Sequence, residues 1–161
     1  MSVPDDLEVY GTLSILARLK EGLTGVHVNT IGMRPKTDGL EEWVDFYPVG
    51  DLRARSRRAN WDGRMLFQFS CNSRIEEGRA DHDTVAPQRL AARVRKLFEH
   101  VDVPVRKVGA GEDVIACLNF HEARQRYLPR RNITFEGEGN FSVEQGNTHA
   151  VVVTVQATLV V

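Results

Sequence analysis

The apolar positions between residues 3 and 21 recur every three or four residues, as they do along a helix that buries one face. Ser2 offers a hydroxyl for the start of such a helix, and Asp5 and Asp6 suit the positive end of its dipole. We therefore predict a first helix over residues 3–21, ended by Gly22. Its buried face is expected to contain Leu7, Tyr10, Leu13, Ile15, Leu16, Leu19 and Leu23.

Three later stretches have the alternation or the apolar clustering of strands. Residues 26–31 and 43–49 predict two short strands, with turn-forming residues at 32–39 between them. Pro48 and Gly50 are expected to end the second of these strands. Residues 64–73 alternate most clearly, so one face of this strand is expected to enter the core through Met65, Phe67, Phe69 and Cys71.

A second amphipathic pattern predicts a helix over residues 84–100. Asp83 or Thr84 is expected to cap it, and Pro87 then falls within about its first turn. We expect this helix to pack on the sheet through the apolar stripe formed by Leu90, Val94, Leu97, Phe98 and Val101.

The remaining residues predict mostly strands. Residues 103–108 and 114–120 are typical of a hairpin joined across glycines, while residues 132–136 and 141–143 predict two short strands. The segment that begins at 122 is compatible with a helical turn or a loop. Residues 150–161 alternate strongly and predict a closing strand. The order of elements predicts an α+β fold, a mainly antiparallel or mixed sheet with two helices on one side, in one domain over residues 1–161.

Composition and charge fit an ordinary globular domain. The 161 residues are 42% hydrophobic and 27% charged, with a net charge of -1, so the chain lacks the basic excess of a dedicated DNA-binding domain. Acids stand near the N-terminus where a signal peptide carries Lys or Arg, and no apolar run reaches about 18 residues. We expect a cytosolic protein in which Cys71 and Cys117 are free thiols.

The motifs that suggest catalysis are incomplete. His121 and Glu122 begin like a zinc-protease helix, but Gln125 stands where the second imidazole is required. The acids around His82 have an ordinary explanation as helix-capping residues, and two short glycine motifs lack the third glycine of a pyrophosphate-binding loop. We expect no catalytic, cofactor or metal site, although an enzyme can also assemble its site from distant residues.

An arginine-rich segment is the only local feature that suggests a function. Such a segment can be a solvated loop or hairpin tip, a contact between copies of the chain, or a lining that meets DNA phosphates. The sequence leaves these alternatives open. The arginines are Arg53, Arg55, Arg57, Arg58 and Arg64.

The order of the elements resembles the tail terminator family of long-tailed bacteriophages, also called tail completion or minor tail proteins and typified by that of phage lambda. The resemblance covers most of the chain. It is carried by the opening helix with LSILARLKEGLTGVHV, the strand EEWVDFYPV, the strand GRMLFQFSCNS after the arginine-rich turn, the helix RLAARVRKLF and the closing strand HAVVVTVQATLVV.

This resemblance implies a virion structural protein that forms a hexameric ring on the end of the tail tube. The ring stops tube polymerisation and offers a joining surface to the head. The implied partners are further copies of the chain, the tail tube protein, the head-completion or stopper protein and, transiently, DNA in the lumen, with no membrane. The implied location is the host cytoplasm during assembly and later the tail–neck junction. Residues 122–146 depart from the shorter family pattern and are expected to be an inserted contact segment.

A ring requires two different complementary patches on each subunit. We expect the arginines named above to provide one patch, and acids to provide the other, namely Glu41, Glu42, Glu76 and Glu77. The alternatives are a stopper or tail tube protein of the same particle, a small cytosolic enzyme or ligand-binding domain, and a nucleic-acid accessory protein that uses the arginine-rich segment.

Overall fold

A computed structural model describes residues 6–30, 39–49, 55–57, 60–74, 80–107, 113–128, 134–135, 141–142 and 148–161. The helices are α1 (Leu7–Gly22) and α2 (Ala80–Phe98). The strands are β1 (His27–Thr30), β2 (Glu42–Val49), β3 (Arg55–Arg57), β4 (Asn60–Arg74), β5 (Asp102–Arg106), β6 (Val114–Phe120), β7 (Arg124–Leu128), β8 (Thr134–Phe135), β9 (Phe141–Ser142) and β10 (Thr148–Val160).

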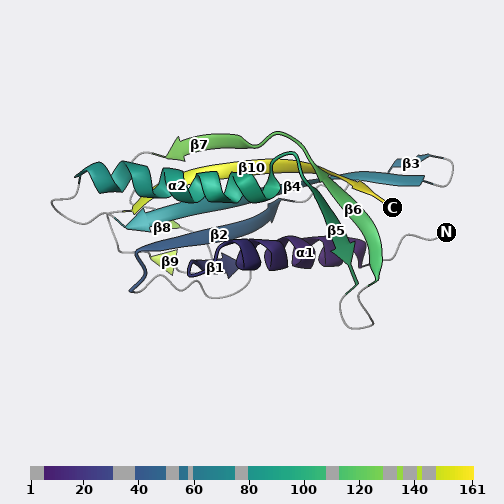
Figure 1. Cartoon of the computed structure of the whole chain (residues 1–161), viewed down its shortest axis with the longest axis horizontal. Coiled ribbons are helices and arrows are strands. Elements are labelled where there is room, and N and C mark those ends of the chain that lie inside the picture. The colour runs from purple at the N-terminus through teal and green to yellow at the C-terminus, as the bar shows by residue number, and fades with distance from the viewer. Residues whose placement is uncertain are drawn as a thin grey trace.

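Eight of the described strands form one sheet (Figure 1). Its main order is β1-β2-β4-β10-β6-β5, while β3 pairs with β4 and β7 pairs with β10. The pairing of β1 with β2 is parallel, and the other pairings in this sheet are antiparallel. Strands β8 and β9 pair with each other in a separate small sheet.

Strand β10 joins the two halves of the main sheet. One of its edges pairs with β4 over its whole length, from Thr148 opposite Arg74 to Val160 opposite Asp62. Its other edge pairs first with β7 and then with β6. The strands β1, β2, β3 and β4 on one side therefore connect to β5, β6 and β7 on the other through β10.

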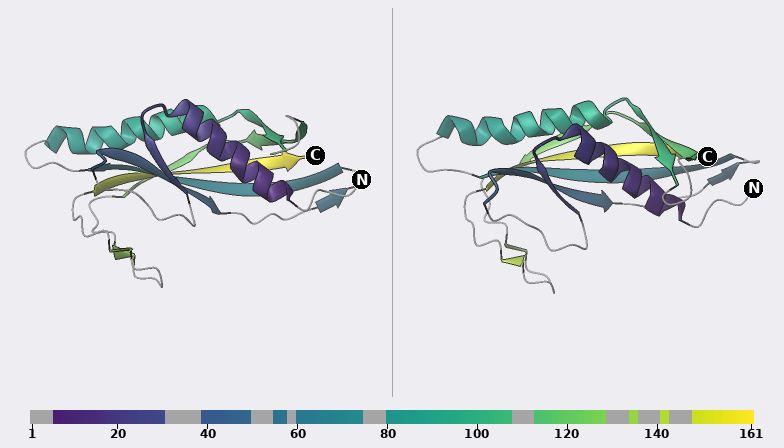
Figure 2. Two further views of the ribbon diagram at one scale, coloured as in Figure 1. Left: turned by 90° about the horizontal axis from the view of Figure 1, so that it is seen from below. Right: turned by 60° about the horizontal axis from the view of Figure 1, so that its bottom comes forward.

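Both helices cover the same face of the sheet (Figure 2). The main contacts of α2 are with β4, β10 and α1, and those of α1 are with β5 and α2. The helices meet near their C-terminal ends, where the Arg18 Nε donates to the Leu97 carbonyl at 2.8 Å. The predicted α+β fold, a mostly antiparallel sheet with two helices on one side, is confirmed.

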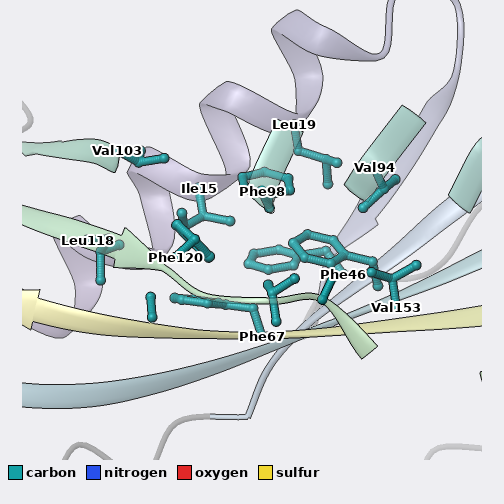
Figure 3. Packing of buried hydrophobic residues seen from close by; sticks show 14 of the residues in the cluster. Ile15, Leu19, Phe46, Phe67, Val94, Phe98, Val103, Leu118, Phe120 and Val153 are labelled. Atoms are coloured by element: carbon teal, nitrogen blue, oxygen red, sulfur yellow. The ribbon is translucent and has the colours of Figure 1, made fainter. Parts of the chain in front are cut away.

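The core between helices and sheet centres on five phenylalanine rings (Figure 3). Each ring contacts two others, with centroids 4.9 to 6.0 Å apart, so the contacts form a closed circuit. Stacked and tilted aromatic pairs at such distances stabilise beyond the area that they bury. The rings come from β2, β4, β6 and α2, and they are Phe46, Phe67, Phe69, Phe98 and Phe120.

The predicted inner face of β4 is confirmed, because Met65, Phe67, Phe69 and Cys71 are all buried. In β10 the buried alternation runs from Val151 to Leu159. The two sets face the same way, since Val153 lies opposite Phe69 and Val155 opposite Phe67. The prediction of a strand over 150–161 is likewise confirmed, within bounds of Thr148–Val160.

The start of α2 was predicted wrongly. The helix begins at Ala80, so neither Asp83 nor Thr84 can be its cap, and Pro87 lies inside it rather than in its first turn. The pyrrolidine removes one backbone donor, but Pro87 is buried and adds its ring to the apolar face. In α1, described from Leu7, the expected contributions of Ser2 and Asp5 lie outside the described residues.

Two strand predictions also need correction. Pro48 does not end β2, which continues to Val49; Gly50 lies outside the described residues. Residues 124–128 are neither a helical turn nor a loop, because they form β7 alongside β10. After the break at 121–123 the chain continues along β10, and the Glu99 carboxylate accepts a hydrogen bond from the Ala123 N–H at 3.1 Å. The end of α2 thus satisfies a backbone donor at this break.

Candidate assembly surfaces

The arginine-rich segment forms a hairpin at one end of the sheet (Figure 1). Strand β3 pairs with the first residues of β4, placing Arg55 opposite Asp62 and Arg57 opposite Asn60. Residues 60 and 61 of β4 precede the stretch that pairs with β10, so the hairpin extends past the end of β10. Among the residues that the structure describes here, the strand pairing of 55–57 with 60–62 is that of a hairpin and not of an irregular loop.

The predicted interface residues are described only in part. Arg64 and Glu41 are exposed, and Glu42 is half-buried. The backbones of Arg55 and Arg57 belong to β3, while their side chains are not among those described. Arg53, Arg58, Glu76 and Glu77 lie outside the described residues.

The arginine hairpin and the acids Glu41 and Glu42 lie at opposite ends of β4. Glu42 is the register partner of Ser73, whereas Arg57 is the register partner of Asn60. A strand rises about 3.3 Å per residue, so these two positions are separated by roughly 40 Å along β4. These two parts of β4 therefore do not meet within the chain.

A hydrogen-bonded polar cluster lies on the face of the sheet away from the helices. The Asn29 amide donates to Asp45 Oδ1 at 3.1 Å, and the Asn72 amide donates to Asp45 Oδ2 at 3.0 Å. His27 Nε2 lies 2.8 Å from Asn29 Oδ1, and the Ser70 hydroxyl donates to Asn72 Oδ1 at 3.2 Å. The cluster therefore links β1, β2 and β4 across three neighbouring strands.

Burial raises the pKa of Asp45, and hydrogen bonds from Asn29 and Asn72 oppose that shift. Burial also raises the pKa of Tyr47 to about 12, and the negative charge of Asp45 adds to this effect. The same two causes raise the pKa of the Cys71 thiol to about 12, so this thiol is not an activated nucleophile.

Both carboxylate oxygens of Asp45 accept hydrogen bonds from side-chain amides. A carboxylate in this arrangement helps to order the strands that carry its partners, because the Asn29 hydrogen bond would be lost if β1 moved away from β2, and the Asn72 hydrogen bond if β2 moved away from β4. Sequence reasoning missed this cluster. The available signal was at least one polar residue at an outward position of each of three strands, but the residues that meet are not neighbours in the sequence.

The described residues show little of the geometry of a catalytic pocket. Within them, no group of three or more His, Cys, Asp or Glu side chains is arranged to hold a metal ion. A depression of about 460 Å³ lies over the turn between α1 and β1, lined by residues such as Lys20, Glu21 and Thr24. In the same described part of the chain, neither helix is long and apolar enough to span a membrane.

The fold is similar to that of solved structures along its whole length. One similar chain belongs to the virion of a native gene transfer agent (GTA) particle, with 13% identity and a TM-score of 0.58 over 98% of this chain and 100% of that chain. A second solved chain is 13% identical, with a TM-score of 0.52 over 99% of this chain and 97% of its own. At this identity the likeness shows the fold. Neither a protein-family model nor a curated protein sequence matches the chain.

Proposed function

We propose that this chain is a virion structural protein of a tailed, phage-like particle, and that it acts as the tail terminator. The observation that carries the proposal is the fold shared with a chain from a gene transfer agent virion, which extends over 98% of this chain and 100% of that one. The order of sequence elements resembles the tail terminator family independently of that likeness.

In this proposal identical subunits close into a ring on the last layer of the tail tube. The ring covers the docking surface of the next tube subunit, so polymerisation stops without any chemical step. Its opposite side then offers a joining surface to the head. The separation of the arginine hairpin from Glu41 and Glu42 along β4 supports the proposal, because a ring needs different patches at two ends of each subunit.

The test combines the purified chain with a tail tube protein of the same phage-like particle. Electron microscopy of the chain alone should show a small ring or a monomer. When it is added to polymerising tube protein, tubes should stop at shorter lengths and carry extra density on one end. An equal mass of an unrelated globular protein is the control for crowding.

Two outcomes would contradict the terminator role. Long tubes formed by the chain alone would identify it as a tail tube protein. Unchanged tube lengths combined with binding to a head connector would favour a stopper protein. Either result would leave a virion role standing, whereas binding to neither assembly would remove it.

A further inference from the structure

One end of the main sheet has five strands side by side, in the order β1-β2-β4-β10-β7. The strand registers put all five at one level, because a single row of opposite residues runs across them. The row consists of Asn29, Asp45, Ser70, Val152 and Arg126. Strands β1 and β7 are therefore the two edges of the sheet at this end, on opposite sides of it (Figure 1).

Each of these two edge strands pairs with another described strand on one side only. Strand β1 pairs with β2, and β7 pairs with β10. Neither strand contains a proline, since their sequences are HVNT and RQRYL. The second edge of each strand is thus of the kind to which a further strand adds through backbone hydrogen bonds.

The edge strand β5, toward the other end of the sheet, is protected against such an addition. Pro104 in the middle of β5 has no N–H to donate. The Arg106 N–H donates to the Ser14 Oγ at 3.2 Å, so α1 accepts another backbone donor of β5. The opposite edge at that end is β3, which spans only three residues. Among the described strands, β1 and β7 are therefore the pair of edges suited to addition on both sides of the sheet.

Side-chain hydrogen bonds hold both of these edge strands in place. On β1, the Asn29 amide donates to Asp45 Oδ1 at 3.1 Å, and His27 Nε2 lies 2.8 Å from Asn29 Oδ1. On β7, Gln125 Oε1 accepts a hydrogen bond from Arg95 Nη1 of α2 at 3.3 Å. A strand that is held in this way presents its edge in one position, which lowers the entropic cost of binding.

The two edge strands run in opposite directions. Strand β1 is parallel to β2, whereas the pairings of β2 with β4, β4 with β10 and β10 with β7 are all antiparallel. When two copies lie side by side in the same orientation, β7 of one copy therefore meets β1 of the next as an antiparallel neighbour. Antiparallel pairing is the slightly more stable kind. The sheet itself thus carries both halves of a strand pairing, and a second copy of the chain supplies the missing half.

We propose that successive copies of this chain join their sheets, with β7 of one copy adding to the edge of β1 on the next. With the rows kept level, Arg126 lies opposite Asn29, and Gln125 lies opposite Thr30. Arg126 is exposed in the single chain, and the pairing brings its guanidinium toward the Asp45 carboxylate on the same face. The contact rests on the proposed ring and names the strands that form it. It is heterologous, as a closed ring requires.

A disulfide between copies tests the strand pairing. Opposite residues of antiparallel strands are close enough for a disulfide. In a Cys117→Ser background, Thr30→Cys mixed with Gln125→Cys should form a linked dimer under mild oxidation. Within one chain, three strands separate β1 from β7, a distance of roughly 19 Å, so the two positions cannot be linked internally. The remaining thiol, that of Cys71, is buried.

The matched control mixes Thr30→Cys with Asp102→Cys in the same background. Asp102 is exposed on β5, the protected edge strand. This mixture should give no linked dimer above the level that each variant gives alone.

A charge reversal on β7 gives a second measurement. Arg126→Glu should associate about tenfold more weakly than the wild type, because a carboxylate then approaches the Asp45 carboxylate. Arg126→Lys keeps the charge and should stay within about twofold of the wild type. Arg93→Glu makes the same change of charge at an exposed position of α2 and should associate like the wild type. Light scattering and sedimentation measure the association.

Both experiments use the chain alone and the chain added to polymerising tail tube protein. The strand pairing is wrong if the Thr30→Cys and Gln125→Cys mixture links no better than its control in both conditions, or if Arg126→Glu associates like the wild type. If the pairing fails while the chain still shortens tubes, the ring forms through other contacts and the terminator function stands. If linked dimers form while tube lengths are unchanged, the pairing stands and the terminator function fails.

Discussion

The two faces of the sheet are held in order by different kinds of interaction. The face under the helices is apolar and contains a closed circuit of five phenylalanine rings. The opposite face carries a cluster of hydrogen bonds around one carboxylate, that of Asp45. The first arrangement depends on volume and the second on donor and acceptor geometry.

The two faces of the sheet therefore stabilise different parts of the fold. Close packing under α1 and α2 determines how strongly the helix layer is attached to the sheet. Hydrogen bonds on the outer face determine how β1 and β2 lie against β4, because unpaired buried amides are costly. Substitutions that change volume should therefore act mainly on the inner face, and those that change hydrogen bonding should act mainly on the outer face.

The largest expected effect comes from Phe69→Ala. Phe69 is fully buried and contacts both Phe46 and Phe98, with centroids at 5.3 and 4.9 Å. Removal of the ring leaves a cavity that should cost about 3 to 5 kcal/mol of unfolding free energy. Urea denaturation measures the loss, and Phe69→Leu should recover a large part of it. Equal losses for the two variants would contradict the role of volume.

On the outer face, Asp45→Ala should cost about 1 to 3 kcal/mol, because the amides of Asn29 and Asn72 each lose one hydrogen-bond acceptor. Protection of β1 amides from hydrogen exchange should fall more than that of β10. Asp102→Ala, at an exposed acid, is the matched control and should stay within about 0.5 kcal/mol of the wild type. Unchanged protection of the β1 amides from hydrogen exchange would show that the cluster does not order that strand.

The helix layer can be tested with one substitution at two glycines of α1. A Cβ at Gly22 would overlap Leu97 Cδ2, so Gly22→Ala should cost about 1 to 2 kcal/mol. A Cβ at Gly11 would meet the flexible Met65 side chain at 3.4 Å, and alanine favours a helix, so Gly11→Ala should be neutral or stabilising by up to about 1 kcal/mol. In thermal melts the melting temperature of Gly22→Ala should fall, whereas that of Gly11→Ala should stay the same or rise. Equal melting shifts would argue against the close contact of α1 with Leu97.

The smallest expected effect is a change of folding stability with pH, caused by Asp45 on the outer face of the sheet. Burial raises the pKa of Asp45 in the folded state, so the folded protein holds this proton at pH values where the unfolded chain has released it. The contribution of Asp45 to stability is therefore greatest in acid and falls as the pH rises through the range just above the ordinary carboxyl pKa. Compared with Asp45→Asn, the wild type should lose stability over that range. A gain in the stability of the wild type relative to Asp45→Asn over the same pH range would contradict the raised pKa of Asp45.

Sequence patterns predicted the elements whose burial is regular. In β4 and β10 every second residue enters the core, so periodicity alone was sufficient there. In α1 the buried residues also recur along one face, but Leu13, which was predicted to be buried, is 39% exposed. Strand β7 was missed because Arg124 and Arg126 are polar and exposed, which removes the apolar alternation. The early start of α2 was missed because Pro87 is typical of a first turn.

The candidate surfaces were harder to predict than the fold. The arginine-rich segment could be recognised from its composition. The register of β3 with β4 could not, because it depends on which residues pair across the two strands. The cluster around Asp45 draws Asn29 and Asn72 from strands on either side of β2, so it depends on sheet order.

Because β10 lies in the middle of the sheet but near the end of the chain, the complete sheet can form only late in folding. Every other strand of the main sheet precedes it in the chain, yet the pairings that join β4 to β6 and β7 all pass through it. During synthesis the β2–β4 and β5–β6 pairs can form early, but they stay separate until residues 148–160 leave the ribosome. Folding of the complete sheet is thus a late event dominated by long-range contacts, which favours slow folding.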